Sequence, residues 1–100
     1  MKGETKERVY ISVIVFFEPT GVLQPKTLIF DDGEKCEITR VLDRCPAAAL
    51  KAGGNADRFT VRIGGQITYL YYERDPWPKP GFLGRWYIEK QPGYYTDSKH

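Results

Sequence analysis

The stretch that decides the fold is Arg58 to Asp75, RFTVRIGGQITYLYYERD, in which two alternating apolar runs flank a pair of glycines. Alternation of apolar and polar residues is typical of a half-buried β-strand, and glycine supplies the positive φ angle that a tight hairpin turn requires. We therefore predict a β-hairpin that turns at Gly64 and Gly65. The segments on both sides of this hairpin also have the pattern of short strands, which makes it the centre of the fold.

The hairpin has two registers, which place different residues in the core. A two-residue loop at Gly64 and Gly65 puts polar Gln66 and Thr68 on the same face as Val61. A three-residue loop that starts one residue earlier, with Gly65 left-handed, gathers a fully apolar face: Phe59, Val61, Ile67, Tyr69 and Tyr71. The opposite face then carries Arg58, Thr60, Arg62, Thr68, Leu70 and Tyr72. Because a slip of one residue moves every side chain to the other face, burial of the apolar set favours the three-residue loop.

The rest of the chain supplies further strands, which we expect at about 8–18, 23–30, 35–42 and 85–90. A turn signal at 31–33 separates the second from the third, and broken alternation in the third predicts a β-bulge near Thr39 and Arg40. Pro46 introduces one expected helical turn at 47–51. The prolines between residues 76 and 84 predict a stiff loop.

Short antiparallel strands joined by tight turns predict one small all-β domain. We expect an SH3-like barrel or strongly curled antiparallel sheet of five to six strands, with at most one short helical turn. The chain has 100 residues, of which 41% are hydrophobic and 14% aromatic, which suffices for a single core. We expect a disordered N-terminus at 1–7, the barrel at 8–90 and a flexible tail at 91–100.

The apolar run from Val9 to Phe17 raises the question of a membrane segment or a signal peptide. The run is far shorter than the ~20 residues that cross a bilayer as a helix, and no small-residue cleavage site follows it. The two cysteines, Cys36 and Cys45, lack metal-binding spacing, and we expect two buried free thiols in preference to a disulfide. These features predict a cytoplasmic protein with no membrane partner.

The chain lacks the residues that most catalytic sites need. The single histidine is His100, and the only serines are Ser12 and Ser98. The part that we expect to fold therefore holds no histidine-assisted nucleophile, and two cysteines without histidines do not make a zinc site. No phosphate-binding glycine motif occurs. We predict that the protein is not an enzyme and has no catalytic residues, no metal and no cofactor.

Binding is the class of function that remains, and a basic and aromatic set of residues is the first candidate site. Its members lie in or beside the expected strands: Arg40, Arg44, Arg58, Arg62, Tyr72 and Arg85, with Tyr87 at a compatible parity. Arginine pairs with phosphate, and aromatic rings stack on the bases of single strands with about 1–3 kcal/mol per base. The alternative is a solvated face on which Arg58 and Arg62 pair with nearby carboxylates, and this is the commoner arrangement.

Trp77, in the sequence Pro76-Trp77-Pro78-Lys79-Pro80, is the second candidate. It is either an exposed anchor for a partner protein or a lid folded over the end of the barrel, and we favour the lid. Two functions thus stay open. The first is a module that contacts single-stranded nucleic acid or a DNA-processing protein, and the second is a protein–protein interaction or homo-oligomeric module.

The strand and turn residues also form a recognisable pattern. Its segments are Asp32-Gly33, Ile38-x-Arg40-Val41-Leu42-Asp43, Arg58-Phe59-x-Val61-Arg62-Ile63-x-Gly65, Leu70-x-Tyr72-Glu73 and Arg85-Trp86-Tyr87-Ile88. This pattern, over residues 9–90, resembles an uncharacterised family of small bacterial β-barrel proteins, some of them encoded near Y-family translesion DNA polymerases. The resemblance implies an SH3-like barrel in a bacterial cytoplasm and an accessory role in DNA repair. It implies no catalytic residues.

Overall fold

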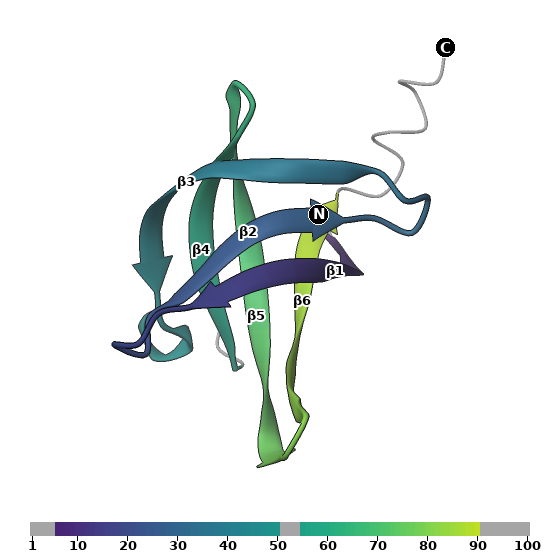
Figure 1. The fold of residues 1–100 in the computed structure, drawn as a ribbon. Helices are drawn as coiled ribbons and strands as arrows, with labels where there is room; N and C mark the ends of the chain where they lie inside the picture. Colours follow the sequence, from purple (N-terminus) through teal and green to yellow (C-terminus); the bar gives the residue numbers. More distant parts are fainter. Residues whose placement is uncertain (1–5, 51–54, 91–100) are drawn as a thin grey trace.

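The computed structural model describes residues 6–50 and 55–90, and these form β-strands with a single short 3-10 helix. The elements are β1 (Glu7–Phe17), β2 (Leu23–Ile29), β3 (Lys35–Cys45), η1 (Ala47–Ala49), β4 (Ala56–Ile63), β5 (Gln66–Lys79) and β6 (Phe82–Lys90). Each strand pairs antiparallel with the next, and β6 closes onto β1, so the six strands form a closed barrel (Figure 1). The predicted small all-β barrel is confirmed.

Figure 1 shows β1, β2 and β3 running across the direction of β4, β5 and β6, and the end of the β5–β6 hairpin extending beyond the barrel. Bulges allow the sheet to bend in this way. One lies in β2 at Lys26, opposite Ile14 and Val15 of β1, and β3 has another between Ile38 and Arg40, where the sequence predicted one. The hydroxyl of Thr39, at the β3 bulge, donates a hydrogen bond across to β4.

The core lies inside the barrel, where side chains from every strand meet. Leu28, Phe59, Val61 and Leu70 are buried at its centre. Partly buried residues pack around them: Ile11, Val13, Leu23, Phe30, Cys36, Ile38, Val41, Ile63, Tyr72, Trp86 and Ile88. Each fully buried side chain of this size stabilises the fold by about 1.5–3 kcal/mol, so this cluster is the main source of stability.

The central hairpin turns through two residues, so the three-residue loop predicted from the sequence is wrong. Ile63 pairs with Gln66 across the turn. Gly64 has a φ of 59°, as the first position of a type II′ turn requires, and Gly65 does not take the left-handed conformation that we expected of it.

This register changes which side chains of β5 point inward. Phe59 and Val61 point inward as expected, but Phe59 pairs with Leu70, which is fully buried. The expected inward residues Ile67 and Tyr69 are exposed instead. The sequence-based assumption was that the bulkier apolar set belongs in the core. The structure instead puts the tyrosines on the outside, where other rings and guanidinium groups contact them.

The proline-rich stretch from 76 to 84 is not a loop, because β5 and β6 continue through it as a long hairpin arm. Lys79 pairs with Phe82 around a turn in which Gly81 has a φ of 83°. No pairs join the two strands between Arg74 and Lys79, so the prolines there interrupt no ladder hydrogen bond. Trp77 on this arm is 81% exposed, so the predicted lid is wrong.

Three smaller expectations have clear outcomes. The helical turn is η1, which begins at Ala47 after Pro46 as expected but is shorter and ends at Ala49. Cys36 and Cys45 are free thiols, as predicted, but both are half-buried. Of the expected disordered ends, 1–5 and 91–100 lie outside the described residues, and β1 already begins at Glu7. Within the described residues, no helix has the length and apolar character needed to cross a bilayer.

Candidate nucleic-acid interface

Four tyrosines form a connected set on the outside of the barrel, across β1, β5 and β6. Tyr71 pairs with Tyr87, and their rings stack with centroids 4.9 Å apart and an interplanar angle of 8°. Tyr10 pairs with Tyr87 from the other side, and these rings meet edge to face at 5.5 Å. Tyr69 continues the row along β5 at 6.5 Å from Tyr71. Each such contact adds about 0.5–1.5 kcal/mol, so the rings hold one another in place.

Three arginines lie over these rings. The guanidinium carbon of Arg8 is 4.5 Å from the ring centroid of Tyr87, and that of Arg58 is 4.5 Å from the centroid of Tyr69. Arg85 lies 4.1 Å from the centroid of Tyr10. At exposed sites such cation–π contacts stabilise by about 0.5–1 kcal/mol. We call this set of residues the Tyr–Arg face: Arg8, Tyr10, Arg58, Tyr69, Tyr71, Arg85 and Tyr87.

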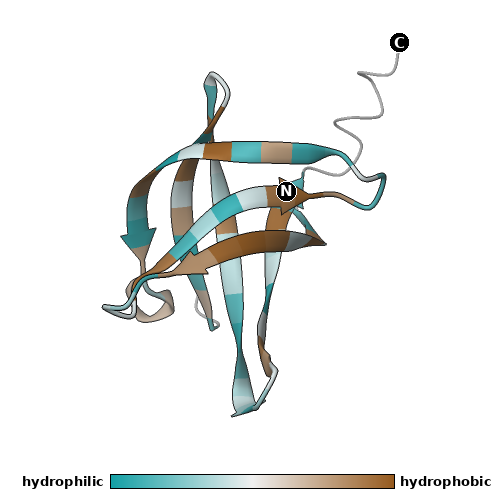
Figure 2. Cartoon of the chain, viewed as in Figure 1, coloured by the Kyte–Doolittle hydropathy of each residue, from teal (hydrophilic) through white to brown (hydrophobic). Residues whose placement is uncertain are grey.

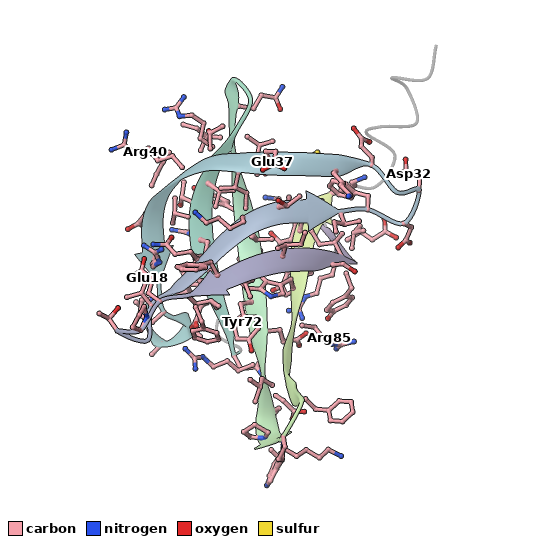
Figure 3. All side chains as sticks on the ribbon, viewed as in Figure 1. Glu18, Asp32, Glu37, Arg40, Tyr72 and Arg85 are labelled. Atoms are coloured by element: carbon pink, nitrogen blue, oxygen red, sulfur yellow. The ribbon has the colours of Figure 1, made fainter. Side chains whose placement is uncertain are left out.

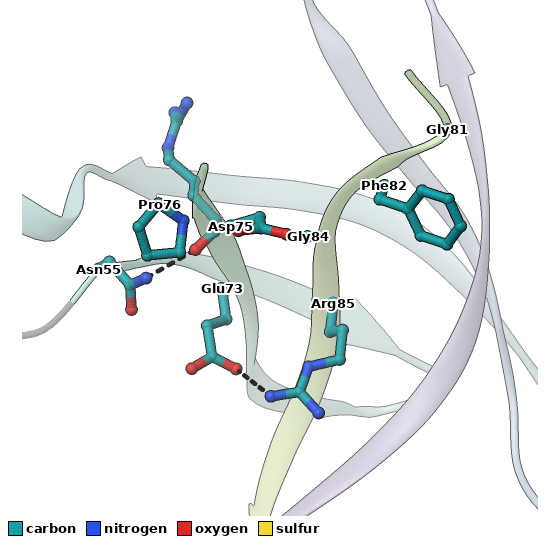
Figure 4. A pocket seen from close by; sticks show the side chains of 9 residues that line it. Asn55, Glu73, Asp75, Pro76, Gly81, Phe82, Gly84 and Arg85 are labelled. Carbon is teal, nitrogen blue, oxygen red and sulfur yellow. Dashed lines mark hydrogen bonds and ion pairs between the residues drawn. The ribbon is translucent and has the colours of Figure 1, made fainter. Parts of the chain in front are cut away.

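Glu73 anchors one side of the Tyr–Arg face. Its carboxylate accepts a hydrogen bond from the Tyr10 hydroxyl at 2.8 Å and from Arg8 at 3.3 Å. Arg85 approaches the same carboxylate at 3.4 Å (Figure 4). Because one negative charge faces two guanidinium groups, this side of the face keeps a positive excess.

Arg58 is held differently from the other two arginines of the face. Its Nε is buried and has no hydrogen-bond partner among the described residues. The described residues provide no ion pair for it either. A charged donor left unsatisfied in this way costs free energy, because the group has lost water without gaining an acceptor.

Arg40 and Arg62 extend the positive surface beyond the rings. The two lie directly opposite each other on β3 and β4, and both are exposed. Neither forms an ion pair within the part of the chain that the structure describes. Like charges directly opposite on neighbouring strands are destabilising, and a bound anion would relieve this repulsion. Figure 3 shows Arg40 projecting away from the barrel.

Burial changes the acid–base behaviour of the stacked pair. It raises the pKa of Tyr71 to about 12, and the nearby carboxylate of Glu89 adds to this effect. Burial also raises the pKa of Tyr87. A tyrosine with its ordinary pKa of about 10 is already neutral near pH 7, and the raised pKa values widen this neutral range, so neither ring repels a phosphate.

Two residues proposed from the sequence lie away from the Tyr–Arg face. Tyr72 points into the barrel, where its ring centroid is 4.8 Å from that of Trp86 (Figure 3). Arg44 lines the mouth of the barrel and donates a hydrogen bond to the Gln24 side chain at 2.7 Å. The predicted face of Arg58, Arg62 and Tyr72 is thus wrong in its aromatic member, because the two-residue turn puts Tyr72 inside.

The remaining candidates from the sequence lie on the outside of the molecule. Arg58 and Arg85 belong to the Tyr–Arg face, Arg40 and Arg62 border it, and Trp77 is on the hairpin arm. Of the other members of the face, Tyr87 was noted from the sequence for its parity, Tyr69 and Tyr71 were assigned to the core, and Tyr10 and Arg8 were not identified. The alternation of Tyr69 with Tyr71 was a usable signal, but its assignment to the core concealed it.

Two hollows adjoin the hairpin arm. One of about 510 Å³ lies beside Glu73 and Arg85 and is lined by both polar and apolar residues, and Figure 4 shows it from close by. The other, about 910 Å³, is the mouth of the barrel, lined by apolar side chains such as Phe17 and Trp86. At its rim Asp57 accepts hydrogen bonds from the Ala47 amide and from the Arg74 guanidinium, at 3.0 and 2.7 Å.

The described residues contain no group of three or more histidine, cysteine, aspartate or glutamate side chains placed to hold a metal ion. Comparisons of the chain with protein-family models, curated protein sequences and solved structures give no match.

Proposed function

We propose that the protein is a non-catalytic module that binds single-stranded nucleic acid on the Tyr–Arg face. The observation that carries this proposal is the continuous row of four tyrosine rings with arginines over three of them. Proteins that bind single strands combine aromatic stacking platforms with cationic groups that follow the phosphates. The row offers both on one side of a rigid barrel.

The exposed rings are the stacking sites. Tyr10 and Tyr69 lie at the two ends of the row and are exposed, whereas Tyr87 in its middle is buried. The inner pair of stacked rings gives the ends a fixed support, so little side-chain entropy remains to be lost when a base stacks. Only an unpaired base presents its face in this way, which favours a single strand over a duplex.

The arginines without ion pairs are the phosphate contacts. Arg40, Arg58 and Arg62 run from the edge of the ring row across β4 to β3. Guanidinium groups match the geometry of phosphate oxygens and also stack on bases. The overall net charge of +2 is small, so we expect binding from this local cluster and a moderate dependence on salt.

We further propose that the ligand is single-stranded DNA in a bacterial cytoplasm and that the protein assists DNA repair. The resemblance of its strand and turn residues to proteins encoded near translesion polymerases supports this setting. A DNA-processing protein that hands over a single strand is the partner that fits it.

Fluorescence anisotropy with labelled single-stranded oligonucleotides tests the binding proposal. Tyr69→Leu keeps an apolar side chain but removes the ring, and we expect binding to weaken about 5-fold to 150-fold. The matched control is Phe82→Leu, which removes an exposed ring on the hairpin arm and should leave the affinity unchanged.

A salt series tests the electrostatic part. Arg62→Gln should weaken binding to all sequences alike and lower the slope of log affinity against log salt by about 0.7, as expected for one lost phosphate contact on a single strand. No binding by the wild type even at low salt, or equal losses in Tyr69→Leu and Phe82→Leu, would remove the proposal.

The exposure of Trp77 favours a second candidate function, a protein–protein contact through the hairpin arm. Tryptophan contributes more binding energy at interfaces than most residues. The described part of the chain leaves the Trp77 side chain largely uncovered. Trp77→Ala should therefore leave the melting temperature nearly unchanged while abolishing partner binding. A large drop in melting temperature would show that the ring is structural.

A further inference from the structure

The second half of β1 exposes four apolar residues in succession. Ile14, Val15, Phe16 and Phe17 are 49, 37, 54 and 61% exposed. Successive side chains of a strand point to opposite faces, so both faces of this segment present apolar surface to solvent. Figure 2 shows the hydrophobic colour along this part of β1. A surface strand of a folded domain normally has one polar face, and such a run is unexplained unless something covers it.

The same segment also has an open backbone edge. Pairing of β1 with β6 ends at Ile11 and Trp86, and the segment Ser12–Phe17 pairs with β2 alone. Figure 1 shows β1 turning away from β6 beyond that point. No described residue hydrogen-bonds the edge that faces β6, so its amide and carbonyl groups are free to pair with another strand.

The sequence of the edge offers no protection against such pairing. Natural sheets guard their open edges with lysine, proline, inward charges or β-bulges. The bulge opposite Ile14 and Val15 lies in β2, at Lys26, so β1 itself runs through this segment without one. The segment SVIVFF has no charge, no proline and no glycine, and five of its six residues are β-branched or aromatic. This composition strongly favours strand pairing. The open edge is therefore suited to being covered in the working protein.

We infer that the edge of Ser12–Phe17 is covered by the same edge of a second copy of this chain. Two identical edges related by a two-fold axis pair antiparallel and form an isologous, closed contact. No like charges meet, because the segment is uncharged. The result is a sheet in which β2 and β1 of one copy continue into β1 and β2 of the other.

A second copy fits this edge better than an unrelated strand does. The occupant must present apolar side chains on both of its faces, since Ile14 and Phe16 lie on one face of β1 and Val15 and Phe17 on the other. Strands of antiparallel sheets commonly alternate apolar and polar residues and would leave one of these faces uncovered. A second copy meets this requirement, because its own β1 has the same apolar residues on both faces.

Sedimentation velocity on the wild-type chain tests the inference, from about 1 µM to about 500 µM, a range that covers the affinity of small interfaces. We expect a monomer–dimer equilibrium within it. Phe16→Lys places a charge beside the edge and should raise the dissociation constant of the dimer at least tenfold. Ile14→Lys, on the same face, is the second variant and should do the same.

Phe82→Lys is the matched control, because Phe82 is 65% exposed on the hairpin arm and lies off the β1 edge. It should leave the dimer unchanged, and circular dichroism should show β-structure in all variants. A wild type that stays monomeric throughout the range overturns the inference. So does a dimer that survives both lysine variants of β1, or one that Phe82→Lys disrupts equally.

Discussion

The barrel has two halves, which differ in how β1 and β6 meet. In the closed half, residues Glu7–Ile11 pair continuously with Trp86–Lys90, and the outside carries the Tyr–Arg face. In the open half the strands separate, and apolar side chains of β1 and of the hairpin arm are exposed. Where the ladder is complete the outer side chains contact one another, and where it stops they contact little. The chemistry of the surface thus changes at the point where strand pairing ends.

This difference separates two kinds of exposed aromatic residue. Those of the closed half are tyrosines held by rings, guanidinium groups and one carboxylate. Those of the open half are phenylalanine, which has no polar group, and tryptophan, whose only polar group is the indole N–H. The first kind suits a polar, reversible ligand such as a nucleic acid, and the second suits burial against protein.

The largest expected effect compares two leucines, one from the core and one from the open half. Leu70 is fully buried and Leu83 is exposed. Leu70→Ala should lower the free energy of unfolding by about 2–5 kcal/mol, because it leaves a cavity. Leu83→Ala should change it by less than about 0.5 kcal/mol. Urea unfolding at low protein concentration measures both. Similar losses at the two positions would show that the open half is packed as tightly as the core.

The next effect lies at Gly84, where the hairpin arm leaves the barrel. A Cβ there would collide with the Glu73 carbonyl oxygen and come within 2.9 Å of the Tyr72 ring. Gly84→Ala should therefore cost about 1–3 kcal/mol of stability through overpacking. Gly65→Ala is the control, since nothing lies near its Cβ position and its φ is not positive. Thermal unfolding compares the two variants, and equal midpoints would contradict the close packing around Gly84.

The next smaller effect is a gain in binding affinity, which we expect when Glu73 loses its charge. Glu73→Gln removes the charge that Arg8 and Arg85 share, and exposed pairs of this kind contribute about 1 kcal/mol or less to stability. The Tyr–Arg face becomes more positive, so affinity for single-stranded DNA at low salt should rise about 2-fold to 5-fold. Glu34→Gln makes the same charge change in the β2–β3 turn and should have no effect. Unchanged or weaker binding in Glu73→Gln would argue against a phosphate site here.

The smallest effect is the contribution of Tyr71 to the loss of folding stability at high pH. The pKa of Tyr71 is raised to about 12 in the fold, whereas a free tyrosine has a pKa of about 10. Between these values the unfolded chain has released the proton and the folded chain still holds it, so stability falls as pH rises. Tyr71→Phe should make this fall shallower, as measured by urea midpoints from about pH 9 to about pH 11. Identical pH profiles would place Tyr71 in solvent.

The fold was predictable because its signals are local. Alternating residues mark the strands, and the turns at Gly33 and Gly64 need only a few neighbours to form. The bulge near Thr39 was likewise visible as a break in the alternation. The hairpin arm was not predicted, because prolines usually end a strand. The structure accommodates them where β5 and β6 have no pairs to lose.

The candidate site was predictable only in part, because its neighbours come from distant parts of the chain. Arg58, Arg62 and Arg85 were identified by residue type. The stacking of Tyr71 on Tyr87 and the approach of Tyr10 depend on barrel closure, which joins the first strand to the last. Because this closure was not visible in the sequence, burial in the core was the simplest way to cover the rings of the β5 tyrosines. That assumption reversed the register and moved Tyr72 to the wrong face.

Asp57 at the rim of the mouth links parts of the chain that are far apart in sequence. One carboxylate oxygen accepts the amide of Ala47, and the other receives the guanidinium of Arg74 at the root of the hairpin arm. The connection that follows β3 and the arm that carries Trp77 are therefore both hydrogen-bonded to the carboxylate of Asp57. We expect any force that tilts the arm to act on this carboxylate and, through it, on Ala47 at the start of the short helix.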